Sequence, residues 1–156
     1  MNQQDNKTAL DPVLVTGAAG FIGHAVSQRL VERGETVIGI DNLNDYYDPK
    51  LKAARLENLR KLPAFQFEEM DVSDAQSVSK LVQDNDIKRI IHLAAQAGVR
   101  YSIENPFAYQ KSNLQGHLSL LEASRHAKDF QHLVYASSSS VYGDKPMGGA
   151  GFVEEE

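Results

Sequence analysis

A glycine-rich string carries the clearest chemistry in this sequence. Residues 17–23 read GAAGFIG and follow a short apolar run. Glycines let the backbone turn tightly and approach a pyrophosphate, whose charge then lies at the N-terminus of the following helix. Alone, such a string fits a simple tight turn equally well. Its place after a predicted strand and before a helical pattern favours phosphate binding.

An acidic residue strengthens this interpretation. Asp41 ends the next apolar run, about 20 residues beyond the glycines, where a carboxylate accepts hydrogen bonds from the adenosine ribose. The alternative is a solvated turn aspartate before Asn42. A carboxylate repels a 2′-phosphate and no arginine stands beside it in the sequence. The pattern therefore favours NAD over NADP.

Three other polar features each admit two interpretations. Asp71 could accept from the adenine amino group, or merely begin the next helix. Residues 137–140 are all serine; they could bind a sugar hydroxyl, or simply favour a loop. His92 lies in an apolar run, where a lone histidine is usually a satisfied core residue. The other histidines are scattered and there is no cysteine, so we predict no metal site.

Alternating strands and helices must position these groups. The apolar and turn patterns predict strands at residues 13–16, 36–40, 65–67, 89–93 and 132–136, and helices at 21–33, 50–61, from the N-cap Ser73 to Val82, and at 107–127 after Pro106. This order predicts an α/β fold, a Rossmann-like doubly wound parallel sheet with strand order 3-2-1-4-5. Ligands bind such sheets at the carboxyl ends of the strands, where all the candidate groups fall.

Composition excludes several other classes. The 156 residues fit one domain, with 42% hydrophobic and 24% charged residues and a net charge of −5. Interspersed acidic and basic residues argue against a nucleic-acid or membrane surface, and no apolar run approaches the roughly 20 residues of a membrane helix. Residues 1–11 predict a disordered polar tail without a signal peptide. We expect a cytoplasmic protein whose residues 12–156 form the nucleotide-binding domain.

The motifs together resemble the extended short-chain dehydrogenase/reductase superfamily, in its NAD-dependent epimerase/dehydratase branch. The segments that carry the resemblance are 16–23, 41–42, 71–72, 92–95, 112–113 and 137–143. Two longer segments are most similar to UDP-glucuronate 4-epimerases: residues 39–52, GIDNLNDYYDPKLK, and residues 92–102, HLAAQAGVRYS. The all-serine loop before Val141 adds to this similarity.

The resemblance implies an isomerase that uses bound NAD to oxidise C4 of a UDP-sugar and to reduce it from the other face. It implies UDP-glucuronate as the substrate and a homodimer for the full-length parent. The implied cofactor residues are Gly17, Gly20, Phe21, Ile22 and Gly23 for pyrophosphate, Asp41 and Asn42 for ribose, Asp71 and Val72 for adenine, and Leu93, Ala94, Ala95 and Asn113 along the rest of the path.

The same resemblance implies the substrate residues. Ser138 would be the catalytic hydroxyl on the sugar oxygen, with Ser139 beside it. Arg100 suits bidentate binding of a substrate phosphate or carboxylate, although a solvated loop charge explains it equally well.

One family motif is absent from the sequence where it is needed. The catalytic Tyr-x-x-x-Lys of the family would lie past Glu156, so we expect a fold truncated before the C-terminal substrate domain and inactive alone. The string from Tyr46 to Lys50 has the right spacing, but it falls at the adenosine end and Pro49 interrupts it.

Several rival functions stay open. They are a UDP-glucose 4-epimerase, a UDP-glucuronate decarboxylase, a 4,6-dehydratase and a non-catalytic NAD-binding module. Dehydratases of this branch carry Asp-Glu after the catalytic hydroxyl, where this chain has Ser139 and Ser140. The sequence therefore disfavours the dehydratase.

Overall fold

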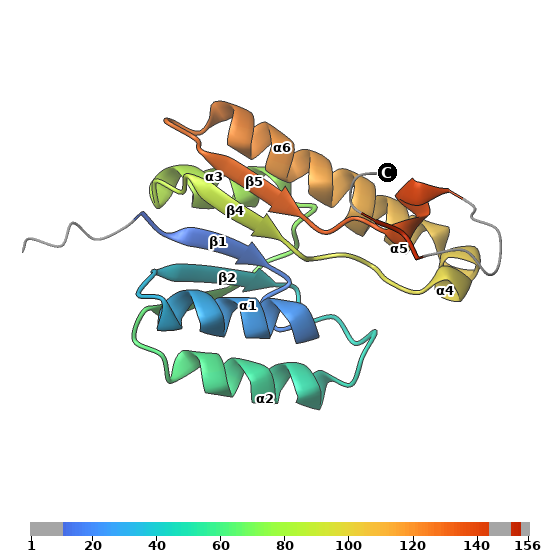
Figure 1. Ribbon diagram of the computed structural model, residues 1–156, viewed down its shortest axis with the longest axis horizontal. Helices are drawn as coiled ribbons and strands as arrows, with labels where there is room; N and C mark the ends of the chain where they lie inside the picture. Colours follow the sequence, from blue (N-terminus) through green and yellow to red (C-terminus); the bar gives the residue numbers. More distant parts are fainter. Residues whose placement is uncertain (1–10, 144–150, 154–156) are drawn as a thin grey trace, which may run out of the picture.

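A parallel sheet forms the centre of the molecule (Figure 1). The computed structural model describes residues 11–143 and 151–153. The sheet has five strands in the order β3-β2-β1-β4-β5, and all neighbours pair in parallel. The strands are β1 (Val13–Thr16), β2 (Val37–Asp41), β3 (Phe65–Glu69), β4 (Arg89–His92) and β5 (His132–Tyr135). The predicted strand order and Rossmann-like fold are confirmed.

Helices cover both faces of the sheet (Figure 1). They are α1 (Phe21–Glu32) and α2 (Pro49–Arg60) on one face, and α3 (Ala75–Asp84) and α6 (Gly116–His126) on the other. Successive side chains of β1 alternate between the faces. Val13 and Val15 pack with Leu30 of α1 and Leu59 of α2, whereas Leu14 packs with the core under α3 and α6.

The helix predicted over residues 107–127 corresponds to a continuous helical run over residues 106–126 that contains an unpredicted π-helical segment. The structure has α4 (Val99–Glu104), which we did not predict, then α5 (Pro106–Tyr109), a π-helical segment η1 (Gln110–Gln115) and α6. The Asn105 side chain accepts from the Ala108 N–H (3.2 Å) and so caps α5. The π-helical segment carries Asn113, whose side chain binds the backbone of Gln96. Apolar periodicity alone does not reveal such an added residue in a turn.

Smaller differences lie at the ends of elements. Asp74, not Ser73, caps α3, because the Asp74 carboxylate accepts from the Ser77 N–H (3.1 Å). The Ser73 hydroxyl instead donates to Asp71 (2.8 Å). Asp11, which we assigned to the polar tail, pairs with Lys88 (3.0 Å); residues 1–10 and the turn-rich residues 144–150 lie outside the described residues.

Candidate functional site

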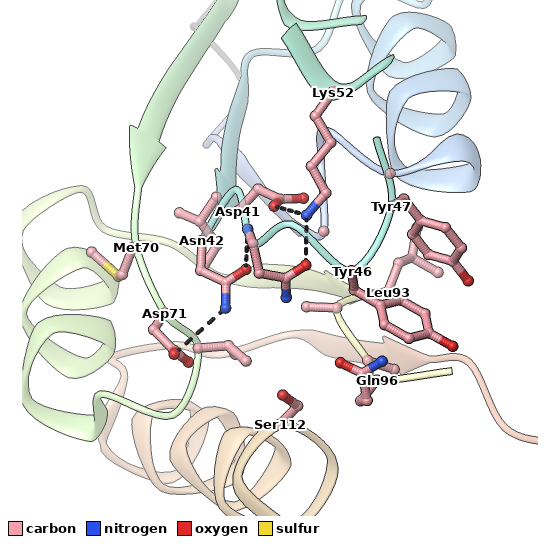
Figure 2. A pocket seen from close by; sticks show the side chains of 17 residues that line it. Asp41, Asn42, Tyr46, Tyr47, Lys52, Met70, Asp71, Leu93, Gln96 and Ser112 are labelled. Atoms are coloured by element: carbon pink, nitrogen blue, oxygen red, sulfur yellow. Dashed lines mark hydrogen bonds and ion pairs between the residues drawn. The ribbon is translucent and has the colours of Figure 1, made fainter. Parts of the chain in front are cut away.

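The carboxyl ends of the strands open into a cavity of about 110 Å³ (Figure 2). Thr16 lies opposite both Ile40 and His92 in the sheet, so β1, β2 and β4 end at the same level. The lining comes from the glycine turn, the loops after β2, β3 and β4, and η1: Gly17, Gly20, Ile40, Asp41, Asn42, Asn44, Tyr46, Tyr47, Lys52, Met70, Asp71, Val72, Leu93, Ala94, Ala95, Gln96 and Ser112. Five segments distant in sequence thus meet at one edge.

The glycine turn presents the start of α1 to this cavity. No side chain caps α1 and its first turn carries no acidic residue, so its backbone N–H groups are suited to an anion. A Cβ at Gly23 would lie 2.0 Å from the carbonyl oxygen of Gly17, which only glycine permits. The side chains of Phe21 and Ile22 point away and are exposed. Their contribution to pyrophosphate binding would come from the backbone.

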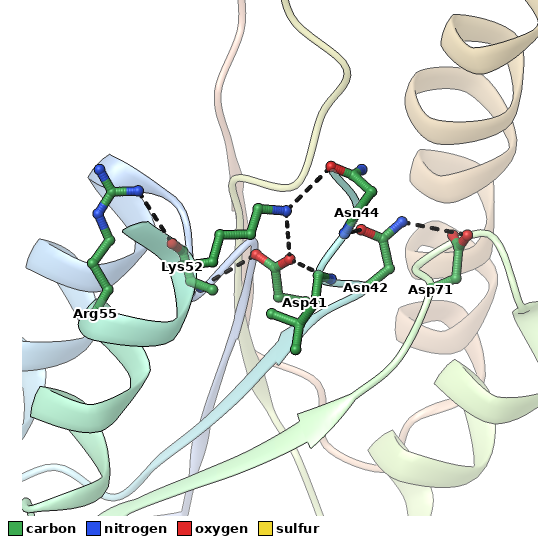
Figure 3. Close-up of polar contacts among 8 residues, drawn as sticks. Asp41, Asn42, Asn44, Lys52, Arg55 and Asp71 are labelled. Carbon is green, nitrogen blue, oxygen red and sulfur yellow. Dashed lines mark hydrogen bonds and ion pairs between the residues drawn. The ribbon is translucent and has the colours of Figure 1, made fainter. Parts of the chain in front are cut away.

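Asp41 is the most tightly held acidic side chain of the site (Figure 3). It is only 7% exposed. Its Oδ2 accepts from the Ala19 N–H (3.2 Å), and its Oδ1 accepts from the Leu43 N–H (2.9 Å) and from Lys52 Nζ (3.1 Å). Oδ2 is therefore held toward the glycine turn, and Oδ1 toward the loop after β2 and α2.

Sequence reasoning missed two basic residues that α2 brings to Asp41. Lys52 is buried and its Nζ also donates to Oδ1 of Asn44 (3.2 Å). Arg55 donates to the carbonyl oxygen of Ala19 (3.4 Å) and its guanidinium lies 5.8 Å from the ring centroid of Phe21. No arginine stands beside Asp41 in the sequence, but the fold places a lysine against it. The helical spacing of the two residues was the available signal.

Asp71 faces Asn42 across the cavity. The Asn42 amide donates to it (3.5 Å), and Lys111 of η1 pairs with it (2.8 Å). Partial burial raises the pKa of Asp71, but hydrogen bonds from Lys111 and Ser73 outweigh that effect and lower the pKa to about 2. The group is thus an ionised acceptor at neutral pH, which fits a role in binding the adenine amino group.

His92 and Thr16 link the ends of β4 and β1. The Thr16 hydroxyl accepts from the N–H groups of Leu93 (3.1 Å) and Ala94 (3.0 Å), so its own proton goes to His92 Nδ1 (2.7 Å). The proton of the neutral ring therefore lies on Nε2. Burial, with a smaller effect of His117, lowers the pKa of His92 to about 4. His92 is thus a buried histidine whose ring holds the Thr16 hydroxyl, and Thr16 in turn holds the backbone of residues 93 and 94 that lines the cavity.

A second cavity, of about 660 Å³, adjoins the first. It is lined by the segment after β4, by η1 and α6, and by the end of β5: His92, Leu93, Ala94, Ala95, Gln96, Ala97, Gly98, Val99, Ser102, Tyr109, Asn113, His117, Tyr135, Ala136, Ser137 and Ser138. Residues 93–96 line both cavities. The two cavities therefore share a wall, and we refer to them together as the groove, with Asp41 in the first cavity and Ser138 in the second.

Asn113 and Ser138 occupy different positions in this second cavity. Asn113 accepts from the Gln96 N–H (2.8 Å) and donates to the Gln96 carbonyl (3.0 Å), so it holds the segment after β4 in place. Ser138 is exposed and begins the short 3-10 helix η2 (Ser139–Tyr142), accepting from the Ser140 N–H (3.2 Å). Its hydroxyl faces the cavity edge where a substrate could meet it.

A cluster of tyrosines joins the loops after β2 and β4. The ring centroids of Tyr46 and Tyr101 are 4.8 Å apart, and a Cβ at Gly98 would lie 2.6 Å from the Tyr46 hydroxyl. Tyr109 donates its hydroxyl to the Gly98 carbonyl. Tyr46 lines the first cavity but not the second. Pro49 begins α2, so Tyr46 and Lys50 do not share a helix.

The structure places some of the predicted site residues around the two cavities and others outside them. Around the first cavity lie Gly17, Gly20, Asp41, Asn42, Asp71, Val72, Leu93, Ala94 and Ala95; around the second lie Asn113 and Ser138. Ser139, Phe21, Ile22 and Gly23 line neither cavity, and Arg100 is exposed on α4 outside both. Within the described residues, no group of three His, Asp or Glu side chains could hold a metal ion.

Comparison with known proteins identifies the family. The sequence profile of the GDP-mannose 4,6 dehydratase family matches residues 14–155. The chain belongs to this family. UDP-glucuronate 4-epimerase 3 of Arabidopsis thaliana is 51% identical over 84% of this chain and 30% of its own length. Protein CapI of Staphylococcus aureus is 47% identical over 84% of this chain and 39% of its own length.

Solved structures agree with the sequence relatives. The UDP-glucuronic acid 4-epimerase of Bacillus cereus, in complex with UDP-glucuronic acid and NAD, superposes with a TM-score of 0.80 at 37% identity, covering 92% of this chain and 44% of that one. The UDP-glucose 4-epimerase of Thermus thermophilus, in complex with NAD, has a TM-score of 0.75 at 34% identity, covering 90% and 42%.

These matches confirm the resemblance to epimerases of this branch. The chain spans less than half the length of each of these relatives. For residues 11–143 and 151–153, we find no helix with the length and apolar character needed to cross a membrane.

Proposed function

We propose that this chain is the NAD-binding part of a nucleotide-sugar 4-epimerase that interconverts UDP-glucuronate and UDP-galacturonate. The observation that carries the proposal is the pair of adjoining cavities at the carboxyl ends of the strands. Residues 93–96 line both cavities, with Asp41 at one end and Ser138 at the other. A dinucleotide bound by its adenosine at Asp41 would thus extend toward the serine that can meet a sugar.

The residues present fit NAD. The uncapped start of α1 suits the pyrophosphate, and the fixed carboxylate of Asp41 suits the ribose hydroxyls. When bound, NAD would supply reversible hydride transfer at C4 of the sugar. Asn113 and the Thr16–His92 pair would keep the wall of the path rigid, and Ser138 would orient the sugar hydroxyl.

UDP-glucuronate is proposed as the substrate on the basis of the sequence relatives. The Arabidopsis relative named for it is 51% identical, and the Bacillus cereus enzyme solved with UDP-glucuronic acid is 37% identical. Ser139 and Ser140 stand where dehydratases of this branch carry Asp-Glu, which disfavours loss of water. We also propose a cytoplasmic location and a homodimer for the full-length parent.

A non-catalytic NAD-binding module is the second candidate. The Tyr-x-x-x-Lys string of this chain begins at Tyr46, which lines the adenosine cavity rather than the one with Ser138. No general base of that motif is thus available to the sugar, and loss of a general base typically costs about 10²–10⁴-fold in rate. The 156-residue chain alone should bind NAD without epimerising.

Two measurements test this proposal. Titration calorimetry should show that the chain binds NAD. Chromatography should then show that UDP-galacturonate forms from UDP-glucuronate, without added reductant, only in a longer form that carries Tyr-x-x-x-Lys beyond the serine loop. If the longer form converts UDP-glucose and not UDP-glucuronate, the proposed substrate is wrong. Turnover by the 156-residue chain at a comparable rate would show that another residue acts as the base.

A further inference from the structure

Two loops of the groove meet across the end of β1. In the sheet β1 lies between β2 and β4, so the glycine turn after β1 lies between the loops that follow those two strands. Tyr46 of the loop after β2 reaches the loop after β4. Its ring centroid is 4.8 Å from that of Tyr101, and its hydroxyl is 2.6 Å from the position that a Cβ of Gly98 would take. This contact therefore bridges the two loops.

The bridge lies at the boundary between the two cavities. Tyr46 lines the first cavity and Gly98 lines the second. In Figure 2 the Tyr46 side chain lies near Leu93 and Gln96, which belong to the wall that both cavities share. A dinucleotide that occupies both cavities, as we propose for NAD, would therefore pass beneath the contact of Tyr46 with Gly98.

The loop after β4 is the fixed side of this bridge. The carbonyl oxygen of Gly98 accepts a hydrogen bond from the Tyr109 hydroxyl of α5. The Tyr101 hydroxyl accepts from the side-chain amide of Asn105 (3.1 Å). Both groups that the Tyr46 ring contacts are thus held by neighbours of their own.

Residues 45–47, which we call the strap, are the movable side. Before the strap, Asn44 Oδ1 accepts from Lys52 Nζ (3.2 Å). After it, the Asp48 carboxylate caps α2. Between these two anchors, the strap touches the loop after β4 through the ring of Tyr46 in the described structure. A swing of this ring would therefore separate the two loops while both anchors stay in place.

We infer that the strap is a gate over the groove, and that a dinucleotide enters and leaves when Tyr46 swings away from Gly98. The inference rests on the proposed NAD site. A pair of aromatic rings in contact shifts an equilibrium by about two- to tenfold, so the strap would be closed for most of the time. Closure slows association and dissociation by a similar factor, because both pass through the open state.

Stopped-flow fluorescence of NADH with the 156-residue chain tests the gate. Mixing gives the association rate constant, and displacement of bound NADH by excess NAD gives the dissociation rate constant. Tyr46→Ala should raise both by about two- to tenfold and leave their ratio, the Kd, within about twofold of the wild-type value. Tyr46→Phe keeps the ring and should keep the slow rates.

Gly98→Ala should open the strap from the fixed side. Gly98 has φ +96°, and its added Cβ would lie 2.6 Å from the Tyr46 hydroxyl but 3.8 Å from Tyr46 Cζ. NADH should therefore exchange as fast as in Tyr46→Ala, and adding Tyr46→Phe should restore slow exchange and raise the thermal unfolding midpoint. If Gly98→Ala is unfolded, Tyr101→Ala removes the partner ring instead and should also speed exchange.

Gly34→Ala is the matched control for backbone strain. Gly34 has φ +87°, and no atom of the described residues lies within 4 Å of the position of its Cβ. This variant should lower the unfolding midpoint by less than Gly98→Ala, because it adds strain without a collision. Its NADH rate constants should equal those of the wild-type chain.

The outcomes separate the gate from a simple contact and from the proposed function. If Tyr46→Ala raises the dissociation rate constant alone, Tyr46 is a binding contact and the gate is overturned. If it changes neither rate constant, the strap does not cover the path of the dinucleotide, and the gate is again overturned while the NAD site stands. If the wild-type chain binds no NADH, the proposed function fails together with the gate.

Discussion

The two ends of the groove differ in how firmly their functional side chains are held. At the Asp41 end, Asp41 and Lys52 are buried and bound to each other and to neighbouring loops. At the Ser138 end, the Ser138 hydroxyl is exposed and bonds to Ser140. The side chains of Val134 and Tyr135 in β5 are 48% and 55% exposed.

The difference shows which part of the proposed ligand site is already ordered. Preorganised donors and acceptors bind without the free-energy cost of ordering at the moment of binding. The Asp41 end has such groups within the described residues. The end with Ser138 presents one exposed hydroxyl beside an open cavity. Binding of the cofactor should therefore be far less sensitive to changes at Ser138 than to changes near Thr16 or Asp41.

The largest effect is expected from Thr16→Val. The hydroxyl bonds to Leu93, Ala94 and His92 at once, and its loss leaves three polar groups, one buried and two partly buried, without this partner. Each such group costs about 1–3 kcal/mol, so we expect the free energy of unfolding to fall by roughly 3 kcal/mol or more. Urea denaturation measures this change. Thr16→Ser retains the hydroxyl and should lose much less; an equal loss in both variants would contradict the proposed bonding.

Lowering the pH should reduce the free energy of unfolding through His92, by less than Thr16→Val does and by more than Ser138→Ala does. The pKa of His92 is lowered to about 4 in the folded chain, against about 6.5 unfolded. Between these values the unfolded state binds more protons, so stability falls as the pH is lowered. From pH 6.5 to pH 5 the loss should be about 2 kcal/mol. Asp71 does not interfere, because its lowered pKa of about 2 affects stability only below its ordinary pKa of 3.8.

Denaturation at several pH values tests the histidine directly. His92→Asn supplies an oxygen in place of Nδ1 and does not titrate. Between pH 6.5 and pH 5, the free energy of unfolding of this variant should therefore lack the loss of about 2 kcal/mol that we expect for the wild-type chain. An unchanged pH dependence in this variant would assign the effect to other groups.

The smallest effect is expected from Ser138→Ala. The hydroxyl is exposed and bonds only within the serine run in the described structure, so unfolding free energy should change by less than about 0.5 kcal/mol and NAD affinity should not change. Thermal unfolding and calorimetry check both. A strong loss of NAD affinity in this variant would contradict the comparison, because Ser138 would then contribute to cofactor binding as the Asp41 end does.

The elements of the fold were predictable from local patterns. Short apolar runs marked the strands, the first two ending at Gly17 and Asp41, and the alternation with helices indicated the parallel order. The π-helical segment was not predictable, because its cause is the contact of Asn113 with the backbone of Gln96, which depends on packing. The choice of Asp74 over Ser73 as a cap depends on local contacts, because Asp71 holds the Ser73 hydroxyl and Asp74 accepts from the Ser77 N–H.

In the candidate site, too, residues that belong to a local motif were predictable, whereas residues placed by packing were not. Residues recognised by a motif, such as Gly17 and Asp41, line the cavity as expected. Lys52 was missed because, apart from its helical spacing from Arg55, nothing in its neighbourhood distinguishes it from Lys50, the other lysine of α2. Its role arises only when α2 lies against the end of β2 and places the ammonium beside Asp41.

The contact of Tyr46 with Gly98 has a consequence for hydrogen exchange. The loops after β2 and β4 would each open by independent local unfolding if they were separate. Because Tyr46 packs against Gly98 and Tyr101, the opening of one loop must break the packing of the other. Their amides should therefore exchange with solvent as one cooperative unit, with similar opening free energies on both sides of the groove.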